Sequence, residues 1–356
     1  MTPREQVETA LQGGHGSKVP FTIYECMIPQ CSVERELRNR GLCIVKRDIP
    51  VYKIHRPNVK VTQHVHWEGE RKFVRTYYET PVGTLSTLKE DAGFTDWYLE
   101  KMFKKPEDYK RLLFMIQDEC YEPNYEEFKQ AEKSFGHDAI FRTHVYLEPL
   151  QELITGEYMS TETFCIEWMD NRDEILKLYH AIVENRRKTY PLIARSPASH
   201  TNYGGNVIPE ITGIDIFEKY YVDHYNEAAE IMHKHGKLIG CHFDGNCKLF
   251  SNAIAGTKLD YIEAFTPAPD TDMTLAEARD VWHDKVLWIN FPSSIHVKSD
   301  EEVTQATIKL LEELKSVDGF IIGITEDMPP YRWQNSCKAI MNGIERHARE
   351  NPALYL

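Results

Sequence analysis

From about residue 139 onward, short apolar segments alternate with segments of helical spacing, and this rhythm limits the possible folds more than any other feature of the chain. The apolar runs have the length of buried strands, and the segments between them have the period of amphipathic helices. Repeats of this kind form parallel sheets, because a parallel connection needs a crossover that a helix supplies. The predicted strands cover residues 139–146, 198–204, 237–243, 261–265, 286–291 and 319–325, and the predicted helices cover residues 171–195, 214–235, 274–283, 300–315 and 333–349.

The number of strands favours a closed barrel. A further apolar segment at residues 19–24 brings the predicted strands to seven, one fewer than a (β/α)8 barrel needs. We expect the eighth within residues 35–50 or 158–168. A doubly wound open sheet is the competing fold, but the Gly-x-Gly-x-x-Gly phosphate loop that it often carries is absent from the sequence. We therefore predict an α/β fold of the TIM-barrel class, as a single domain over residues 1–356.

Three segments lie outside this rhythm. Thr2-Pro3-Arg4-Glu5 has the form of a capping box with proline at the first helical position, and it predicts an N-terminal helical extension. Residues 58–90 contain two alternating segments around a glycine turn, and they predict an inserted β-hairpin region. Residues 106–134 have helical spacing and charge.

Composition excludes some classes of partner. The net charge is −13 and no basic block offsets it, which argues against nucleic acid as a partner. No apolar run is long enough to span a bilayer, and no apolar region after the N-terminus indicates a signal peptide. The eight cysteines are scattered without a Cys-x-x-Cys pair, so we expect reduced thiols in a cytoplasmic protein without a membrane partner.

Polar residues follow most of the predicted strands. In a (β/α)8 barrel the carboxyl ends of the strands share one rim, where chemistry gathers. Each residue alone has a structural explanation, because Asp and Asn are common in loops and helix caps. Together they predict a functional rim, formed by His144, Asn206, Glu210, His242, Asp244, Glu263, Asn290, Glu326 and Asp327.

The segment His242-Phe243-Asp244-Gly245-Asn246 gives the sharpest prediction within this rim. Residues two apart on a strand project to the same side, so His242 and Asp244 are expected to point together. An imidazole and a carboxylate suit a divalent metal or an acid/base pair. We predict a metal site of His242, Asp244 and Glu326, with Glu263 as a fourth ligand, a general base or a hydrogen-bond partner.

Two other groups of residues allow more than one interpretation. His64-Val65-His66 has the same-face spacing of some metal ligands, but it lies in the predicted hairpin. Aromatic residues gather in the first half of the chain and at Trp168, where they would either fill the core or form a lid over a flat or methylated substrate. They are Tyr24, Trp67, Tyr77, Tyr78, Trp97, Tyr98 and Trp168.

Four segments, taken in order, resemble the uroporphyrinogen decarboxylase superfamily. Residues 1–12 with Val19-Pro20 are similar to its first helix and strand, and residues 80–85 to a turn common among its methyltransferases. Residues 241–246 stand in the place of its His-x-Cys-Gly segment, and residues 318–330 look like its last conserved strand and loop. The resemblance covers nearly the whole chain and implies a (β/α)8 barrel, either a tetrapyrrole decarboxylase or a cobamide-dependent methyltransferase.

The methyltransferase branch is the better match. The decarboxylases carry Arg-Gln-Ala-Gly-Arg near the N-terminus, whereas residues 25–32 here contain no arginine. In the coenzyme M methyltransferases, a histidine, a cysteine two residues later and a late cysteine hold zinc. His242 matches that histidine, while Asp244 and Glu326 stand at the cysteine positions. Carboxylates make a harder site than thiolates, which argues against coenzyme M as the acceptor and leaves zinc as the leading metal.

The resemblance therefore implies a metal-assisted methyltransferase, which moves a methyl group from a small O-methyl or N-methyl compound to a corrinoid carrier protein. The corrinoid would come on another chain, because the sequence has no Asp-x-His-x-x-Gly cobalamin loop. Glu263 and Asp244 are the expected catalytic residues, and the expected substrate-binding residues are Tyr24, His144, Asn206, Glu210 and Asn290. A metal-free decarboxylase, a metal-dependent hydrolase and a non-catalytic binding barrel stay open as alternatives, as does a homodimer.

Overall fold

The computed structural model describes residues 1–93 and 96–355, and its chain divides into two compact units. The larger unit comprises Met1–Val51, Tyr125–Tyr146 and the chain from Ser196 onward. The smaller unit comprises Tyr52–Asn124 and Leu147–Arg195. All the predicted rim residues belong to the larger unit.

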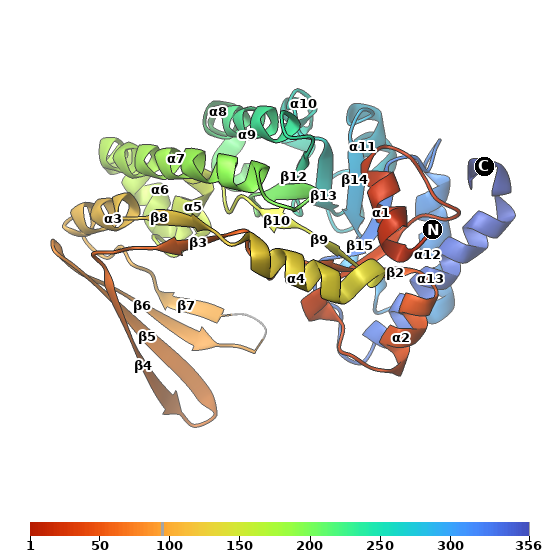
Figure 1. Cartoon of the computed structure of the whole chain (residues 1–356), viewed down its shortest axis with the longest axis horizontal. Helices are drawn as coiled ribbons and strands as arrows, with labels where there is room; N and C mark the ends of the chain where they lie inside the picture. Colours follow the sequence, from red (N-terminus) through yellow and green to blue (C-terminus); the bar gives the residue numbers. More distant parts are fainter. Residues whose placement is uncertain (94–95, 356) are drawn as a thin grey trace. The chain divides into compact units, whose positions relative to one another are not determined.

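The larger unit is a parallel β-barrel, which confirms the predicted fold class (Figure 1). Its sheet runs in the order β10-β11-β12-β13-β14-β15-β1-β2-β9. β9 and β10 are consecutive stretches of one strand, interrupted at Arg142; β9 pairs with β2 and β10 pairs with β11, so the sheet closes on itself. The strands are β1 (Phe21–Tyr24), β2 (Leu42–Lys46), β9 (Ala139–Phe141), β10 (Thr143–His144), β11 (His200–Tyr203), β12 (Leu238–His242), β13 (Tyr261–Phe265), β14 (Val286–Asn290) and β15 (Phe320–Ile324).

Helices of the larger unit follow most of these strands and lie outside them (Figure 1). They are α1 (Pro3–Leu11), α2 (Ser32–Asn39), α4 (Tyr125–Phe135), α8 (Pro209–Tyr220), α9 (Val222–His233), α10 (Ser251–Ala255), α11 (Leu275–Val281), α12 (Asp300–Glu312) and α13 (Trp333–Glu350). The predicted capping box at the start of α1 is present, with the Thr2 and Glu5 side chains and backbones bonded reciprocally. The N-terminal extension thus folds as its local sequence dictates.

The eighth strand is β2, which lies within residues 35–50. The other candidate range, residues 158–168, was wrong for a strand, because Ser160 caps helix α6 there through a bond from the backbone of Thr163. The single helix expected at residues 214–235 is instead two helices, α8 and α9. The first begins with Pro209 at its first position, where the missing N–H of proline costs nothing, but it is broken at the non-helical Gly213, and its second stretch starts at residue 214 as expected.

The barrel interior is filled by large side chains in close contact. Tyr261 and Trp288 are fully buried, and the indole of Trp288 donates a hydrogen bond to Thr22 Oγ1 over 2.9 Å. The ring of Tyr261 lies over Gly240, its neighbour across the β12–β13 pairing. A Cβ atom at Gly240 would lie 2.1 Å from Cε2 of that ring, so only glycine leaves room for the tyrosine.

Gly240→Ala is accordingly expected to destabilise the protein by roughly 1–3 kcal/mol, because the added methyl overpacks the barrel core. Gly256→Ala is the matched control, since a Cβ atom there would meet only ordinary contacts, 3.5 Å from Ala253 O. We expect the control to change stability by less than about 0.5 kcal/mol. Urea unfolding of the three proteins checks the prediction, and equal midpoints would contradict it.

The smaller unit combines antiparallel strands with helices. One sheet has the order β4-β5-β6-β7 and contains the predicted hairpin, with β4 (Lys60–Glu68), β5 (Arg71–Thr80), β6 (Gly83–Asp91) and β7 (Asp96–Glu100). A second sheet pairs β3 (Tyr52–His55) with β8 (Cys120–Pro123). The helices are α3 (Asp108–Gln117), α5 (Pro149–Thr155), α6 (Thr161–Asp170) and α7 (Arg172–Ala194). The helical stretch expected at residues 106–134 is therefore broken, because residues 120–123 pair with β3.

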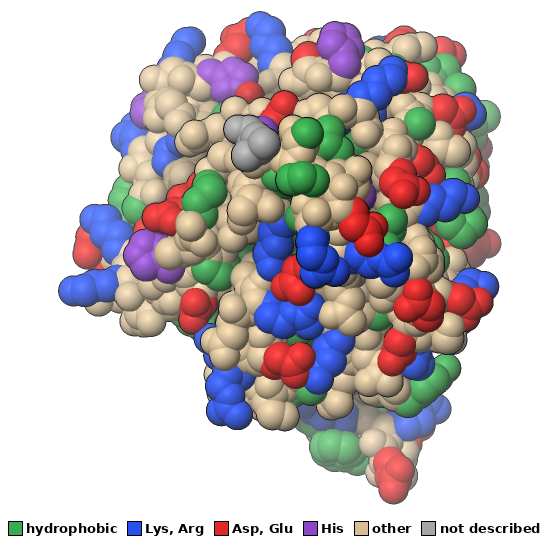
Figure 2. Space-filling model, turned by 90° about the vertical axis from the view of Figure 1, so that its right-hand side faces the viewer, with side chains coloured by type: hydrophobic (Ala, Val, Ile, Leu, Met, Phe, Trp, Pro, Cys, Tyr) green, Lys and Arg blue, Asp and Glu red, His purple; other side chains and the backbone are tan. Residues whose placement is uncertain are grey.

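Charged side chains of both signs lie interspersed on the face that Figure 2 shows, with hydrophobic side chains scattered among them. Charged side chains of the described residues form ion pairs, such as Arg40 with Glu345 at 2.8 Å and Arg38 with Asp138 at 2.8 Å. Exposed pairs of this kind contribute little to stability. Among the described helices, none combines the length and the apolar character needed to cross a membrane.

Candidate functional site

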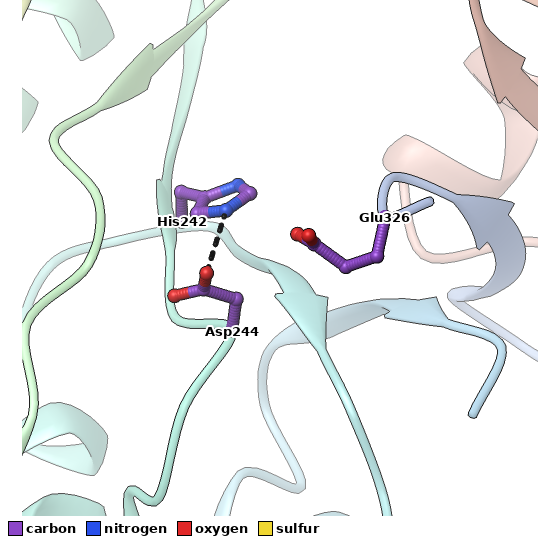
Figure 3. Close-up of side chains that lie close together, drawn as sticks. All are labelled: His242, Asp244 and Glu326. Atoms are coloured by element: carbon purple, nitrogen blue, oxygen red, sulfur yellow. Dashed lines mark ion pairs between the residues drawn. The ribbon is translucent and has the colours of Figure 1, made fainter. Parts of the chain in front are cut away.

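His242, Asp244 and Glu326 meet at the carboxyl ends of the barrel strands (Figure 3). Each offers one atom that could bind a metal ion, and these three atoms lie within 4.8 Å of one another. Figure 3 shows Glu326 pointing toward the other two side chains, and the His242 Nε2–Asp244 Oδ2 distance is 3.5 Å. The structure thus brings together the three residues that the sequence predicted as metal ligands.

The topology of the barrel explains this convergence. His242 is the last residue of β12, Asp244 lies in the turn after it, and Glu326 follows β15 by two residues. The carboxyl ends of parallel strands share one rim, so residues far apart in sequence become neighbours. Gly205 helps to enclose the histidine: its φ is +151°, and a Cβ atom there would lie 3.3 Å from Cδ2 of His242. Glycine therefore allows the loop after β11 to pack against the imidazole.

The two carboxylates of the site repel each other. Burial, followed by the negative charge of Asp244, raises the pKa of Glu326 above its ordinary value. Within the described part of the chain, the Glu326 carboxylate has no hydrogen-bond or ion-pair partner. A half-buried carboxylate that faces a second carboxylate is stabilised when a cation lies between them. One imidazole and two carboxylates form a donor set that suits a divalent ion such as zinc.

Glu263 lies beneath this trio as the centre of a buried polar network. Its side chain has 0% exposure and contacts His242 Nδ1 at 2.7 Å and Arg142 Nη1 at 2.8 Å. Asn202 Nδ2 donates to it over 3.2 Å, and the hydroxyl of Tyr24 donates to its other oxygen. Burial alone would raise the pKa of Glu263, but the charges of Arg142 and His242 outweigh it and lower that pKa. Glu263 is thus an ionised carboxylate surrounded by protein groups.

The same network determines the charge of His242. Burial alone would lower its pKa, but the negative charge of Glu263, with contacts to Asp244 and Glu263, raises the pKa of His242 to about 10. At neutral pH without metal, the ring is therefore an imidazolium between two carboxylates. Glu263 accepts a hydrogen bond from Nδ1 of His242, and the other ring nitrogen, Nε2, faces Asp244. Nε2 is therefore the atom that can bind a metal once it has lost its proton.

In protein stripped of metal by a chelator, stability is expected to depend on pH through His242. The pKa in the folded protein is about 10, above the value of about 6.5 for unfolded histidine. Stabilisation by the charged ring is complete below about pH 6.5 and is lost as the pH rises toward 10. Urea unfolding of the parent and of His242→Gln protein checks this: the gap between their free energies of unfolding should narrow across the window. A constant gap would contradict the expectation.

The predicted substrate-binding residues lie in different surroundings. Tyr24 is buried against Glu263, and Asn290 is buried with its amide bonded to Thr266 Oγ1 at 3.2 Å and to the backbone N–H of Thr325 at 3.0 Å. His144 is half-buried, with its ring 4.6 Å from that of Tyr146. Two residues are nearer to solvent. Asn206 has a left-handed backbone with φ of 59°, and the exposed Glu210 accepts a bond of 2.7 Å from Asn246.

Sequence reasoning missed Arg142 and Asn202, which the structure places against Glu263. A signal for the first was present, because Arg142 interrupts the apolar run Ala139-Ile-Phe141. A buried arginine requires a carboxylate partner, and Glu263 lies within another predicted strand. Asn202 carried no such signal, because a polar residue near a strand end is common.

Other candidates lie elsewhere. His64 and His66 are on strand β4 of the smaller unit, where His66 stacks on Phe73 with ring centroids 5.0 Å apart. Neither belongs to a metal-ligating group among the residues that the structure describes. Cys241 and Cys247 are both buried. Burial raises the pKa of the Cys247 thiol, as expected for a small residue in an apolar environment.

No protein-family model matches this sequence, and no curated protein matches it. Similar folds occur among solved structures. A methyltransferase from Methanosarcina mazei has 11% identity and a TM-score of 0.50, over 71% of this chain and 72% of that chain. Thiamine phosphate pyrophosphorylase from Pyrococcus furiosus has 11% identity and a TM-score of 0.32, over 93% and 95% of the two chains. A pneumococcal exo-β-D-N-acetylglucosaminidase, StrH, has 9% identity and a TM-score of 0.40, over 95% and 83%. At 11% identity, the likeness to the methyltransferase from Methanosarcina mazei establishes the fold alone.

Proposed function

We propose that this chain is a metal-assisted methyltransferase of the uroporphyrinogen decarboxylase superfamily. It would take a methyl group from a small O-methyl or N-methyl compound and pass it to a corrinoid held by a partner protein. The observation that carries the proposal is the trio at the barrel rim, where Glu326 and Asp244 face each other beside His242. The sequence resemblance and the barrel fold shared with a methyltransferase from Methanosarcina mazei support the same reaction class.

His242, Asp244 and Glu326 would hold a divalent metal, with zinc as the first choice. When bound, the metal would supply a Lewis acid for the charge that develops on the donor oxygen or nitrogen as the methyl group departs. A reduced corrinoid on the partner protein would be the methyl acceptor, and both electrons of the broken bond would stay on the donor atom. That atom finally takes up a proton.

The remaining residues of the buried network position the side chains of the trio. Glu263 orients the imidazole of His242, and Arg142, at 2.8 Å, keeps Glu263 ionised. Glu263 thereby acts as a positioning residue rather than one that touches the substrate. Asn206 and Glu210, which lie after β11, are the candidates for binding the methyl donor.

A metal-free reaction is the second candidate, and one observation favours it. Burial and the charge of Asp244 raise the pKa of Glu326, which is the direction that a proton donor to a departing oxygen needs. Chelation separates the two candidates. Activity that survives complete removal of metal would indicate that Glu326 is a general acid rather than a metal ligand. A lyase of the same fold would then be the favoured function.

Elemental analysis combined with a methyl-transfer assay tests the proposal. We expect about one divalent ion per chain in the parent, strongly reduced content in His242→Ala and Glu326→Gln, and unchanged content in Asp327→Asn. Asp327 is a matched control, because it is adjacent to Glu326 but exposed and outside the trio. Methoxylated aromatics and methylamines are offered with a reduced corrinoid protein, whose absorbance reports methylation. Protein with neither metal nor methyl transfer would overturn the proposal.

A further inference from the structure

Strand β4 forms an edge of the four-stranded sheet in the smaller unit (Figure 1). It is nine residues long and exposed at almost every position. Three large apolar side chains lie along it, with exposures of 50% for Val61, 54% for Val65 and 63% for Trp67. Natural edge strands are usually short or interrupted by charge or proline, yet residues 61–67 contain no Asp, Glu, Lys, Arg or Pro. This edge is therefore unprotected.

The register of the hairpin determines which backbone groups point outward. Glu68 lies opposite Arg71 across a two-residue turn, and such a closing pair is hydrogen-bonded. Alternate residues from Glu68 backward thus bond to β5, and the intervening residues direct their N–H and C=O groups to the free edge. The outward set is Val61, Gln63, Val65 and Trp67. A new strand could pair with these four residues without disturbing the hairpin.

The side chains of this outward set continue a buried layer of the sheet. Val61 lies opposite Tyr78, which in turn lies opposite Leu85, and both Tyr78 and Leu85 are buried. Gln63 is opposite Thr76, which is also buried. On this face of the sheet, the side chains of β5 and β6 named above are buried, whereas those of β4 are exposed to solvent. An added strand would extend the layer and remove apolar surface from water.

The pattern of β4 is complementary to itself when reversed. If two copies pair antiparallel with His64 opposite His64, Val61 faces Trp67, Gln63 faces Val65 and Lys60 faces Glu68. Each of these pairs occurs twice, as a twofold axis requires. All nine residues are paired in this register, whereas a shift by two residues leaves overhangs and separates Lys60 from Glu68. Opposite charges facing across strands are favourable, and like charges are unfavourable.

We propose that β4 is the interface of a homodimer, in which two copies pair antiparallel about a twofold axis at His64. The two four-stranded sheets then form one continuous sheet. The occupant is a second copy, because Lys60 and Glu68 become opposite charges when the strand pairs with its own reverse; within one chain, Lys60 also pairs with Glu79 across the hairpin at 3.4 Å. This interface does not depend on the metal site or on the reaction proposed above.

Sedimentation velocity of the full chain over a concentration series gives the first test. We expect a dimer for the parent and for Val65→Thr, which keeps the outward N–H and a branched side chain. Val65→Pro should be monomeric, because it removes a ladder donor at the free edge, where proline leaves the bonds to β5 intact. Thermal unfolding checks that both variants fold. A monomeric parent, or a Val65→Pro protein that dimerises like the parent, would overturn the proposal.

Charge exchange tests the register. Lys60→Glu places glutamates opposite one another in both outer pairs, and Glu68→Lys does the same with lysines, so each variant should dimerise roughly tenfold more weakly. An equimolar mixture of the two variants restores two opposite-charge pairs and should form the heterodimer at parental affinity. The double variant Lys60→Glu/Glu68→Lys should likewise recover. If the single variants dimerise more weakly but their equimolar mixture does not regain the parental affinity, this register is contradicted.

Discussion

Arg142→Met protein is expected to lose about 3–5 kcal/mol of its free energy of unfolding, because the change leaves Glu263 without its arginine in the barrel interior. Arg142 is 5% exposed, and its Nη1 lies 2.8 Å from Glu263 Oε1. Methionine keeps much of the apolar volume of the arginine stem but supplies no charge. The loss is therefore electrostatic in origin, and urea unfolding at neutral pH measures it.

A double-mutant cycle with Glu263→Gln isolates this term. Arg142→Met/Glu263→Gln should be less destabilised than the sum of the two single variants, with a coupling energy of about 0.5–3 kcal/mol. Arg47→Met is the matched control, since Arg47 also stacks on the Tyr24 ring, 3.3 Å from its centroid, but is partly exposed. We expect the control to cost less than about 1 kcal/mol. Strict additivity in the cycle would show that the pair contributes no net stability.

The barrel strands could be predicted because they are buried on both sides. A strand such as Tyr261–Phe265 is then apolar at every position except Glu263, and the sequence alone locates it to the residue. β2 was harder to locate, because charged residues flank it: Arg38 and Arg40 precede it, and Arg47 and Asp48 follow it. The interruption of β9 and β10 at Arg142 was not predicted, since nothing local distinguishes a strand from two stretches of one strand.

The smaller unit was less predictable because its structure depends on distant pairing. Residues 120–123 form strand β8 through pairing with β3, more than sixty residues earlier in the chain. Residues 120–123 have no alternating pattern that predicts a strand, and the helical spacing and charge of the surrounding residues 106–134 favour a helix instead. The hairpin of β4 and β5 was predictable, because its turn and both strands are adjacent in sequence.

The candidate site was predictable to the extent that barrel topology determines it. The spacing of His242 and Asp244 and the rule that strand ends share a rim were enough to group them with Glu326. The network around Glu263 was beyond sequence reasoning, because it depends on which residues face inward from β1, β11 and β13. Whether Glu263 is a ligand, a base or a positioning group follows only from its contacts with Arg142 and His242.

Glu263→Gln is expected to weaken metal binding by roughly 10- to 100-fold while leaving the three ligands in place. The carboxylate lies 2.7 Å from His242 Nδ1 and holds the ring so that Nε2 faces Asp244. An amide of the same size removes the negative charge that makes the imidazole a better donor. Competition with a chromophoric chelator for zinc at fixed pH, at a temperature where the variant is fully folded, measures the change.

Glu210→Gln is the matched control for this experiment, because Glu210 is a rim carboxylate that bonds to Asn246 rather than to the imidazole. Its zinc affinity should equal that of the parent. Since Glu263 acts through His242, combining Glu263→Gln with His242→Ala should weaken binding no further than His242→Ala alone. A further loss of zinc affinity in the double variant would mean that Glu263 contacts the metal itself. An unchanged zinc affinity in Glu263→Gln would mean that the contact of Glu263 with His242 Nδ1 does not contribute to metal binding.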